Sequence, residues 1–117
     1  MSIQIKRAYE PASPRDGTRV LVDRLWPRGI SKDKLKLDAW MKELAPSTEL
    51  RKWFHHDVDN WSEFEKRYFK ELSQQPEKVD ELRKQARRHT VTLIYGARDE
   101  THNDAVALKK YLERKAR

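Results

Sequence analysis

The stretch Val91-Thr92-Leu93-Ile94-Tyr95-Gly96 constrains the fold more than any other part of the chain. Its apolar and β-branched residues predict a strand over 91–95, which Gly96 ends. A second run, from Thr18 to Leu25, contains the consecutive apolar residues Val20, Leu21 and Val22. Strands without polar alternation are typical of parallel sheets, in which both faces are covered.

Outward from these two runs, the chain alternates strands with helices. Ile3 to Lys6 alternates apolar and polar residues and indicates a short first strand, and residues 38–44 are expected to form another. Helices are expected to begin at Ser47, Asn60, Pro76 and Thr101, with the proline in a first helical turn and the other three residues as N-caps. The pattern predicts an α/β fold with a single small, mainly parallel sheet of three to four strands flanked by helices.

The composition indicates one folded domain over residues 1–117, because a chain of 117 residues is too short for two full cores. Hydrophobic residues make up 37% and charged residues 38%, but enough aromatic and apolar residues are present to exclude a disordered chain. The chain has no cysteine, which excludes disulfides, thiolate metal sites and a cysteine nucleophile. It also shows no signal-peptide pattern and no stretch of membrane-span length, so we expect a cytoplasmic bacterial protein without membrane contact.

The formal net charge of +7 favours anionic partners, with simple solubility as the alternative. Basic residues cluster over 83–89 and again over 109–117. Basic helices can follow a phosphate backbone, so nucleic acid is a candidate partner. Acidic residues are interspersed in both clusters and no nucleic-acid-binding signature occurs, which favours a solvated surface.

Two polar segments directly follow predicted strands, Asp23 to Gly29 and Tyr95 to Asp104. Ligands of open α/β sheets bind outside the carboxyl ends of the strands, which is where these segments would lie. We expect Arg24, Arg28 and Arg98 to converge on one anion, because the arginine fork meets a phosphate or carboxylate with two parallel hydrogen bonds. The alternative is that Arg24 pairs with Asp23 or Asp99 and only ties the two loops together.

Other side chains of the same segments would complete a ligand site. His102, oriented by the carboxylate of Asp99, is the candidate acid/base group, with a bracing role in the loop as the alternative. Trp26 or Tyr95 would pack against the organic part of the ligand, and for Trp26 a place in the core is the alternative. Asn103 is expected to contact the ligand near the free N–H groups at the start of the last helix.

The segment His55-His56-Asp57-Val58-Asp59 contains residue types that bind metals. Adjacent histidines on a helix point in different directions, and no cysteine or HExxH motif accompanies them. We therefore predict neither a metal nor a cofactor and interpret the segment as a helix end followed by an exposed loop.

The chain resembles the YeaO-like proteins, a bacterial family classed as a domain of unknown function. The opening strand, Val22 to Gly29, Ala45 to Lys52 and Tyr95 to Asn103 carry this resemblance, which extends over nearly the whole chain. The resemblance implies an α/β fold with a small sheet, and it implies no established activity. More distant relatives carry a cysteine near the end of the last strand, where this chain has Tyr95, whereas the family pattern of Arg24, Asp99 and His102 is retained.

Three functional hypotheses follow from the sequence. The leading one is a small anionic ligand, bearing phosphate or carboxylate, held in a cleft at the strand ends. Whether acid/base catalysis accompanies binding stays open, because no complete catalytic set is present. The second is a non-enzymatic basic protein that binds nucleic acid, and the third is a protein-interaction module whose loop motifs are structural.

Overall fold

The computed structural model describes residues 1–114. Its four-stranded sheet is parallel throughout, in the order β1-β4-β2-β3, which confirms the α/β prediction. The strands are β1 (Ser2–Arg7), β2 (Thr18–Leu21), β3 (Ala39–Trp40) and β4 (Thr90–Tyr95). The α-helices are α1 (Lys32–Leu35), α2 (Thr48–Phe54), α3 (Trp61–Leu72), α4 (Pro76–Arg88) and α5 (Asp104–Arg114). Three short 3-10 turns, η1 (Pro14–Asp16), η2 (Lys42–Leu44) and η3 (Val58–Asn60), connect them.

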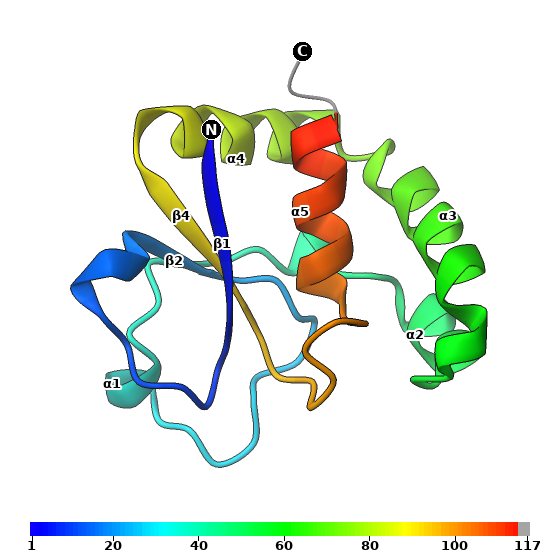
Figure 1. Ribbon diagram of the computed structural model, residues 1–117, viewed down its shortest axis with the longest axis horizontal. Helices are drawn as coiled ribbons and strands as arrows, with labels where there is room; N and C mark the ends of the chain where they lie inside the picture. Colours follow the sequence, from blue (N-terminus) through cyan, green and yellow to red (C-terminus); the bar gives the residue numbers. More distant parts are fainter. Residues whose placement is uncertain (115–117) are drawn as a thin grey trace.

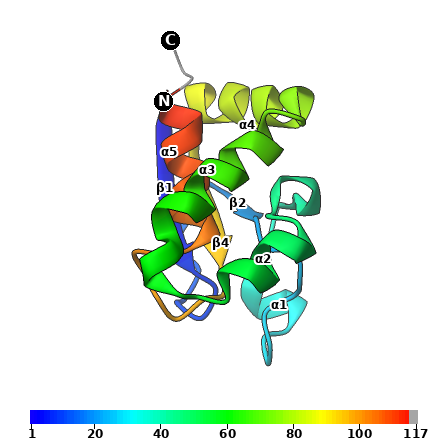
Figure 2. The ribbon, with the colours of Figure 1, turned by 90° about the vertical axis from the view of Figure 1, so that its right-hand side faces the viewer.

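Helices cover the two faces of the sheet unequally (Figures 1 and 2). On one face α4 and α5 pack against β1 and β4, and α3 packs against α5. The other face carries a smaller apolar cluster that includes Leu35 of α1. The larger core therefore lies between the sheet and the layer formed by α3, α4 and α5.

Strand β4 shows why its sequence lacks polar alternation. Its residues Val91, Leu93 and Tyr95 belong to the large core, whereas Ile94 belongs to the smaller cluster on the opposite face. Successive strand residues point to opposite faces, so both faces of this central strand are buried. Thr92, the polar exception, is fully buried and donates its hydroxyl to the carbonyl of Asp16 at 2.6 Å.

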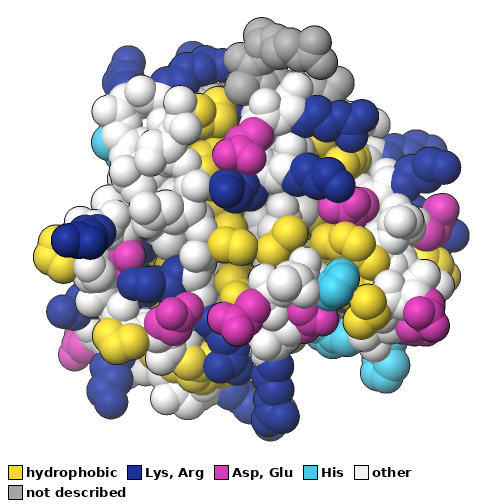
Figure 3. All heavy atoms as spheres, viewed as in Figure 1, with side chains coloured by type: hydrophobic (Ala, Val, Ile, Leu, Met, Phe, Trp, Pro, Cys, Tyr) yellow, Lys and Arg dark blue, Asp and Glu magenta, His cyan; other side chains and the backbone are white. Residues whose placement is uncertain are grey.

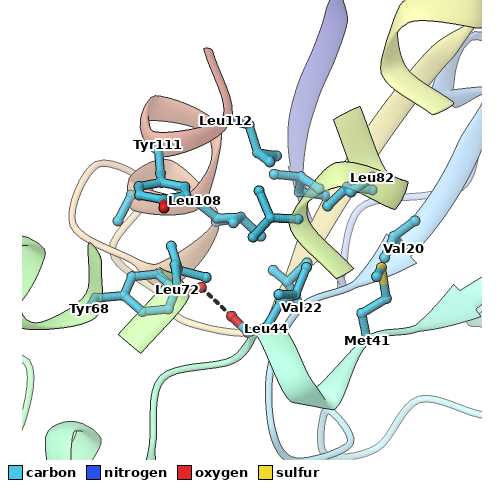
Figure 4. Packing of buried hydrophobic residues seen from close by; sticks show 14 of the residues in the cluster. Val20, Val22, Met41, Leu44, Tyr68, Leu72, Leu82, Leu108, Tyr111 and Leu112 are labelled. Carbon is cyan, nitrogen blue, oxygen red and sulfur yellow. Dashed lines mark hydrogen bonds between the residues drawn. The ribbon is translucent and has the colours of Figure 1, made fainter. Parts of the chain in front are cut away.

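The large core also fixes the segment that leads into α2 (Figure 4). Leucines of α4 and α5 pack there against β2, and Tyr68 of α3 donates its hydroxyl to the carbonyl of Leu44. Burial raises the pKa of Tyr68 well above its usual value, so this hydroxyl stays a donor. The contact holds η2, and with it the start of α2, against α3.

Three of the four predicted helix starts are confirmed and one is wrong. Ser47 caps α2, since its hydroxyl accepts from the backbone N–H of Leu50 at 3.1 Å, and α4 begins at Pro76. Asn60 holds the N-cap position of α3, which begins at Trp61, but its side chain makes no capping hydrogen bond. The start predicted at Thr101 is wrong, because helix α5 begins only at Asp104.

The cap of α5 is Asn103, whose side-chain oxygen accepts from the backbone N–H of Val106 at 3.0 Å. Asparagine and threonine both cap helices, so composition alone did not separate the two positions. The hydroxyl of Thr101 donates to the carboxylate of Asp99 at 3.0 Å and does not cap a helix.

The strand predicted over residues 38–44 is much shorter in the structure. Only Ala39–Trp40 form β3, and Lys42–Leu44 form the 3-10 turn η2. Strand β3 is an edge strand that pairs only with β2, and β2 ends at Leu21, opposite Trp40. Without a partner beyond that pair, the ladder stops.

None of the helices within residues 1–114 is long and apolar enough to cross a membrane.

Candidate functional site

A cavity of about 400 Å³ opens at the carboxyl ends of β2 and β4. Three segments supply most of its lining: the loop after β2, helix α2 with the residues that follow it, and the loop that leads from β4 into α5. The lining residues are Asp23, Arg24, Leu25, Trp26, Pro27 and Arg28; Arg51, Lys52, Phe54, His55 and His56; Gly96, Ala97, His102, Asn103 and Asp104; and Tyr9, Pro46 and Phe64. Parallel strands end at one edge, so this is the edge at which α/β proteins bind ligands.

Arg24 is the half-buried cation of this cavity. Its guanidinium donates from Nε to the carbonyl of Pro46 at 3.2 Å and from Nη2 to the carbonyl of Ala45 at 3.5 Å. Among residues 1–114 it forms no ion pair, with Asp23, Asp99 or any other carboxylate. The alternative in which Arg24 ties the loops together through a carboxylate is therefore not what the structure shows.

Of the other two arginines expected around an anion, one lines the cavity and one does not. Arg28 is exposed on its lining, and the backbone carbonyl of Arg28 accepts from the hydroxyl of Tyr9 at 2.8 Å. Arg98 is exposed and lies outside the lining. In its place the cavity has Arg51 and Lys52 of α2, which the sequence reasoning did not include.

His102 and Asp99 lie in contact, as a histidine and its orienting carboxylate would. Nδ1 of His102 is 3.1 Å from Oδ2 of Asp99 and 2.9 Å from the hydroxyl of Thr101. Backbone N–H groups of Thr101 and His102 also donate to Asp99, and these bonds lower the pKa of that carboxyl to about 2. An ionised carboxylate only accepts, so Nδ1 carries the proton and Nε2 is left for another partner.

The environment of His102 places its ring on the cavity wall, while Asp99 stays behind it. The ring meets Trp61 edge-on, with 5.3 Å between centroids and 87° between planes. His102 lines the cavity and Asp99 does not. Asn103, next along the chain, lines the cavity as well, but its side chain caps α5 and donates to the carbonyl of Asp99 at 2.9 Å.

The two aromatic candidates have different positions. Trp26 is half-buried on the cavity lining, with its indole N–H donated to the carbonyl of Ile30 at 2.7 Å and its ring edge-on to Trp40 at 5.5 Å. Tyr95 is 2% exposed, belongs to the large core and does not line the cavity. Burial raises the pKa of Tyr95, so the residue is a neutral core side chain beneath the site.

A pair of carboxyl groups, Asp23 and Asp104, faces the same cavity and was not among the predicted site residues. Asp23 follows β2, and its Oδ2 accepts from the backbone N–H of Gly96 at 2.8 Å. Asp104 begins α5 and is hydrogen-bonded to Asp23. Burial, then the charge of Asp23 and the bond between them, raise the pKa of Asp104 well above its usual value. Asp104 therefore keeps its proton to a higher pH than a free carboxyl group does.

The sequence contains a signal for this pair, namely the position of both residues in polar segments that follow strands. Asp23 and Asp104 both lie in the polar segments that follow the strands, at the ends of the two stretches that were singled out. From the sequence, Asp104 only ends the second of these segments, and Asp23 is expected only as a possible ion-pair partner of Arg24. Contact between them depends on β2 and β4 being neighbours in the sheet, which the chain order does not reveal.

His55 and His56 line the cavity in a strained backbone conformation. Both have positive φ angles, 45° and 55°, in the left-handed region that favours glycine. Each such residue costs about 1–2 kcal/mol, and strain of this kind clusters at ligand sites. Within residues 1–114 no group of three or more His, Cys, Asp or Glu side chains is arranged to hold a metal ion. Figure 3 shows a group of His side chains on the surface near the position of α2 in Figure 1.

Comparison with known proteins identifies the family. A family profile described as "Inactive DUF488-N3 subclade" matches residues 2–117. The uncharacterized protein YeaO of Escherichia coli is 48% identical over 112 residues, which are 96% of this chain and 97% of that protein. The uncharacterized protein Rv3073c of Mycobacterium tuberculosis is 42% identical over 110 residues, 94% of this chain and 92% of the relative. No solved structure matches the chain. The chain therefore belongs to the YeaO-like family, a DUF488 domain of unknown function.

Proposed function

We propose that the protein binds a small organic anion, bearing phosphate or carboxylate, in the cavity at the strand ends and leaves it chemically unchanged. The matching profile is described as an inactive subclade, which favours binding without turnover. The chain has no cysteine, the residue that the family resemblance associates with the strand end of more distant relatives. What remains in the cavity is a set of groups suited to holding a ligand.

The observation that carries the proposal is the state of Arg24. A half-buried guanidinium has lost part of its hydration, and two long hydrogen bonds to backbone carbonyls replace it only partly. Arg28, Arg51 and Lys52 line the same cavity, and none of them forms an ion pair within residues 1–114. An anion that meets Arg24 would gain charge-assisted, bidentate hydrogen bonds and would offset the local excess of positive charge.

The size and walls of the cavity favour an organic anion over a bare inorganic ion. A volume of about 400 Å³ lies within the range of small-molecule sites, roughly 300–1,000 Å³. Trp26, Phe54 and Phe64 contribute apolar surface to the lining. His102 would present Nε2 as a hydrogen-bonding group that orients the ligand.

The basic helices have contacts that favour the cavity over a nucleic-acid surface. Arg83 is buried and donates to the carbonyls of Leu112 and Tyr111 at the end of α5. Lys109 pairs with Glu113, and Lys110 pairs with Glu65 at 3.1 Å. The basic cluster expected over 109–117 continues at Lys115 and Arg117, which lie outside the described residues. These cations serve the fold, so nucleic acid stays the second hypothesis.

The same proposal includes a cytoplasmic location in bacteria. A cysteine-free chain suits a reducing compartment, where disulfides do not form. A cavity for small phosphorylated or carboxylated compounds suits the compartment in which metabolism produces them.

Thermal unfolding with ligand series tests the proposal. Sugar phosphates, nucleotides and short carboxylates are added to the wild type, to Arg24→Ala and to Arg87→Ala. A ligand at a hundred times its dissociation constant adds about 2.7 kcal/mol and raises the midpoint by several degrees. We expect this shift in the wild type and in Arg87→Ala, which removes an exposed arginine of α4 outside the cavity, and not in Arg24→Ala. An equal shift in both variants, or none in the wild type, would contradict the proposal.

A further inference from the structure

The cavity holds two opposite kinds of group at once. One part of its lining carries the cations Arg24, Arg51 and Lys52, and the part where β2 and β4 end carries the hydrogen-bonded carboxyls Asp23 and Asp104. A site built for an anion alone gains nothing from carboxyl groups on its wall, because they repel the ligand. Their presence in the lining points to a second group on the ligand.

We propose that the ligand is zwitterionic, with an ammonium or similar cationic donor beside its anionic group, and that Asp23 and Asp104 receive the cationic end. This inference rests on the proposed function, since the anionic end is the one that Arg24 binds. The ligand class is therefore an amino-phosphate or amino-carboxylate compound.

The carboxyl pair has acceptor capacity that the protein leaves unused. Asp23 accepts one backbone bond, from Gly96, and Asp104 is bonded to Asp23 and to backbone N–H groups at the start of α5. Neither carboxyl forms an ion pair with a Lys, Arg or His within the described residues. Two carboxyls in contact without a cation are costly to ionise together. An ammonium group would supply both the charge and the donors that the pair lacks.

The backbone keeps this pair accessible from the cavity. Gly96 lies directly over Asp23, where a Cβ atom would come within 3.2 Å of Oδ2 and within 3.9 Å of Pro27. A side chain at position 96 would therefore crowd the carboxylate at the cavity wall. Gly96, Asp23 and Asp104 all line the cavity, so both carboxyls face it.

Matched ligands separate the two ends of the molecule. Titration calorimetry at pH 8 compares O-phosphoethanolamine with ethyl phosphate, and β-alanine with propionate; each pair differs in the amino group. The proteins are the wild type, Asp104→Asn, Asp23→Asn and the control Asp33→Asn, which removes an exposed carboxylate of α1. Because the ammonium group would add a charged hydrogen bond, we expect the wild type and Asp33→Asn to bind the amino compound about tenfold more tightly than the matched compound without the amino group.

In Asp104→Asn and Asp23→Asn we expect this preference to vanish, while ethyl phosphate or propionate binds at least as well as before. Binding of the amino compound should also release the proton of Asp104, seen as a buffer-dependent heat that is absent in Asp104→Asn. Equal binding of the amino and non-amino compounds by the wild type would overturn the zwitterion inference and leave the anion site standing. No binding by any of the four would overturn the proposed function itself. Binding of MgCl₂ alone, lost in Asp104→Asn, would assign the pair to a metal and overturn the inference.

Discussion

Gly17 joins η1 to β2 in a backbone conformation that a side chain does not fit, with φ at 63° and ψ at −131°. A Cβ atom at this position would lie 2.2 Å from the carbonyl oxygen of Thr90, the first residue of β4. We expect Gly17→Ala to lower the free energy of unfolding by about 2 kcal/mol or more, measured by urea denaturation. Gly29→Ala is the control, because Gly29 has a positive φ of 76° but nothing within 4 Å of its Cβ position. Equal losses in the two variants would show that backbone strain alone matters.

Asp104 makes the stability of the fold depend on pH. Burial, together with the charge and hydrogen bond of Asp23, raises the pKa of Asp104 in the folded protein. The folded state therefore holds a proton that the unfolded state releases above a pKa of about 3.9, and stability falls as pH rises towards the folded value. The slope approaches about 1.4 kcal/mol per pH unit for one proton.

We expect Asp104→Asn to remove this slope and to be more stable than the wild type at neutral pH, because the amide resembles the protonated carboxyl. Urea denaturation from pH 5 to pH 8 measures the difference, with Asp33→Asn as the variant that keeps the wild-type slope. A less stable Asp104→Asn at pH 7 would mean that the folded protein needs the ionised carboxylate.

At the scale of elements, Arg83 fastens α4 to α5. Its guanidinium donates to the carbonyls of Leu112 and Tyr111 in α5 at 3.2 and 3.4 Å. A hydrogen bond to a charged group contributes roughly 1.5–3 kcal/mol to the stability of a folded protein. Arg83→Ala should therefore lower the free energy of unfolding by about 2 kcal/mol. Arg87→Ala, on the same helix but exposed, should change it by less than about 0.5 kcal/mol. Equal effects in urea denaturation would show that the fastening contributes nothing.

Elements with one strong local signal could be predicted from the sequence. The buried run 91–95 and the helix start at Pro76 depend on apolar composition and on the missing proline N–H, and both are where they were expected. Predictions that required a choice between neighbouring polar residues failed, as at Thr101 and Asn103, because the choice depends on what else each side chain can bond. Strand β3 was overestimated since its length is set by its partner strand.

In the candidate site, too, some residues could be predicted from a local signal in the sequence and others could not. Residues that follow the strands, such as Arg24 and His102, could be found because the end of a parallel strand is a binding position in any α/β sheet. Arg51 and Lys52 could not, since only the packing of α2 against α3 and the cavity brings them there. Tyr95 was expected at the ligand because it ends a strand, but its side chain points into the large core.

At the scale of the whole molecule, charge distant from the cavity matters only at low salt. The molecule measures 36 × 35 × 20 Å, while the Debye length is about 30 Å at 0.01 M and about 8 Å at 0.15 M ionic strength. Helix α4 lies at the opposite end of the strands from the cavity (Figure 1), beyond a β4 of six residues, about 20 Å. Its exposed cations can therefore attract an anionic ligand in dilute buffer and are screened at physiological salt.

We expect the triple variant Lys84→Gln, Arg87→Gln and Arg88→Gln to bind ethyl phosphate about twofold more weakly than the wild type at 0.01 M ionic strength, and equally at 0.15 M. Titration calorimetry at the two salt concentrations measures the difference. Arg24→Ala should lose binding at both, because its contact with the ligand is direct and partly shielded from solvent. A loss in the triple variant that persists at 0.15 M would mean that α4 contacts the anion itself, and the binding surface would then have to be sought at the other end of the sheet.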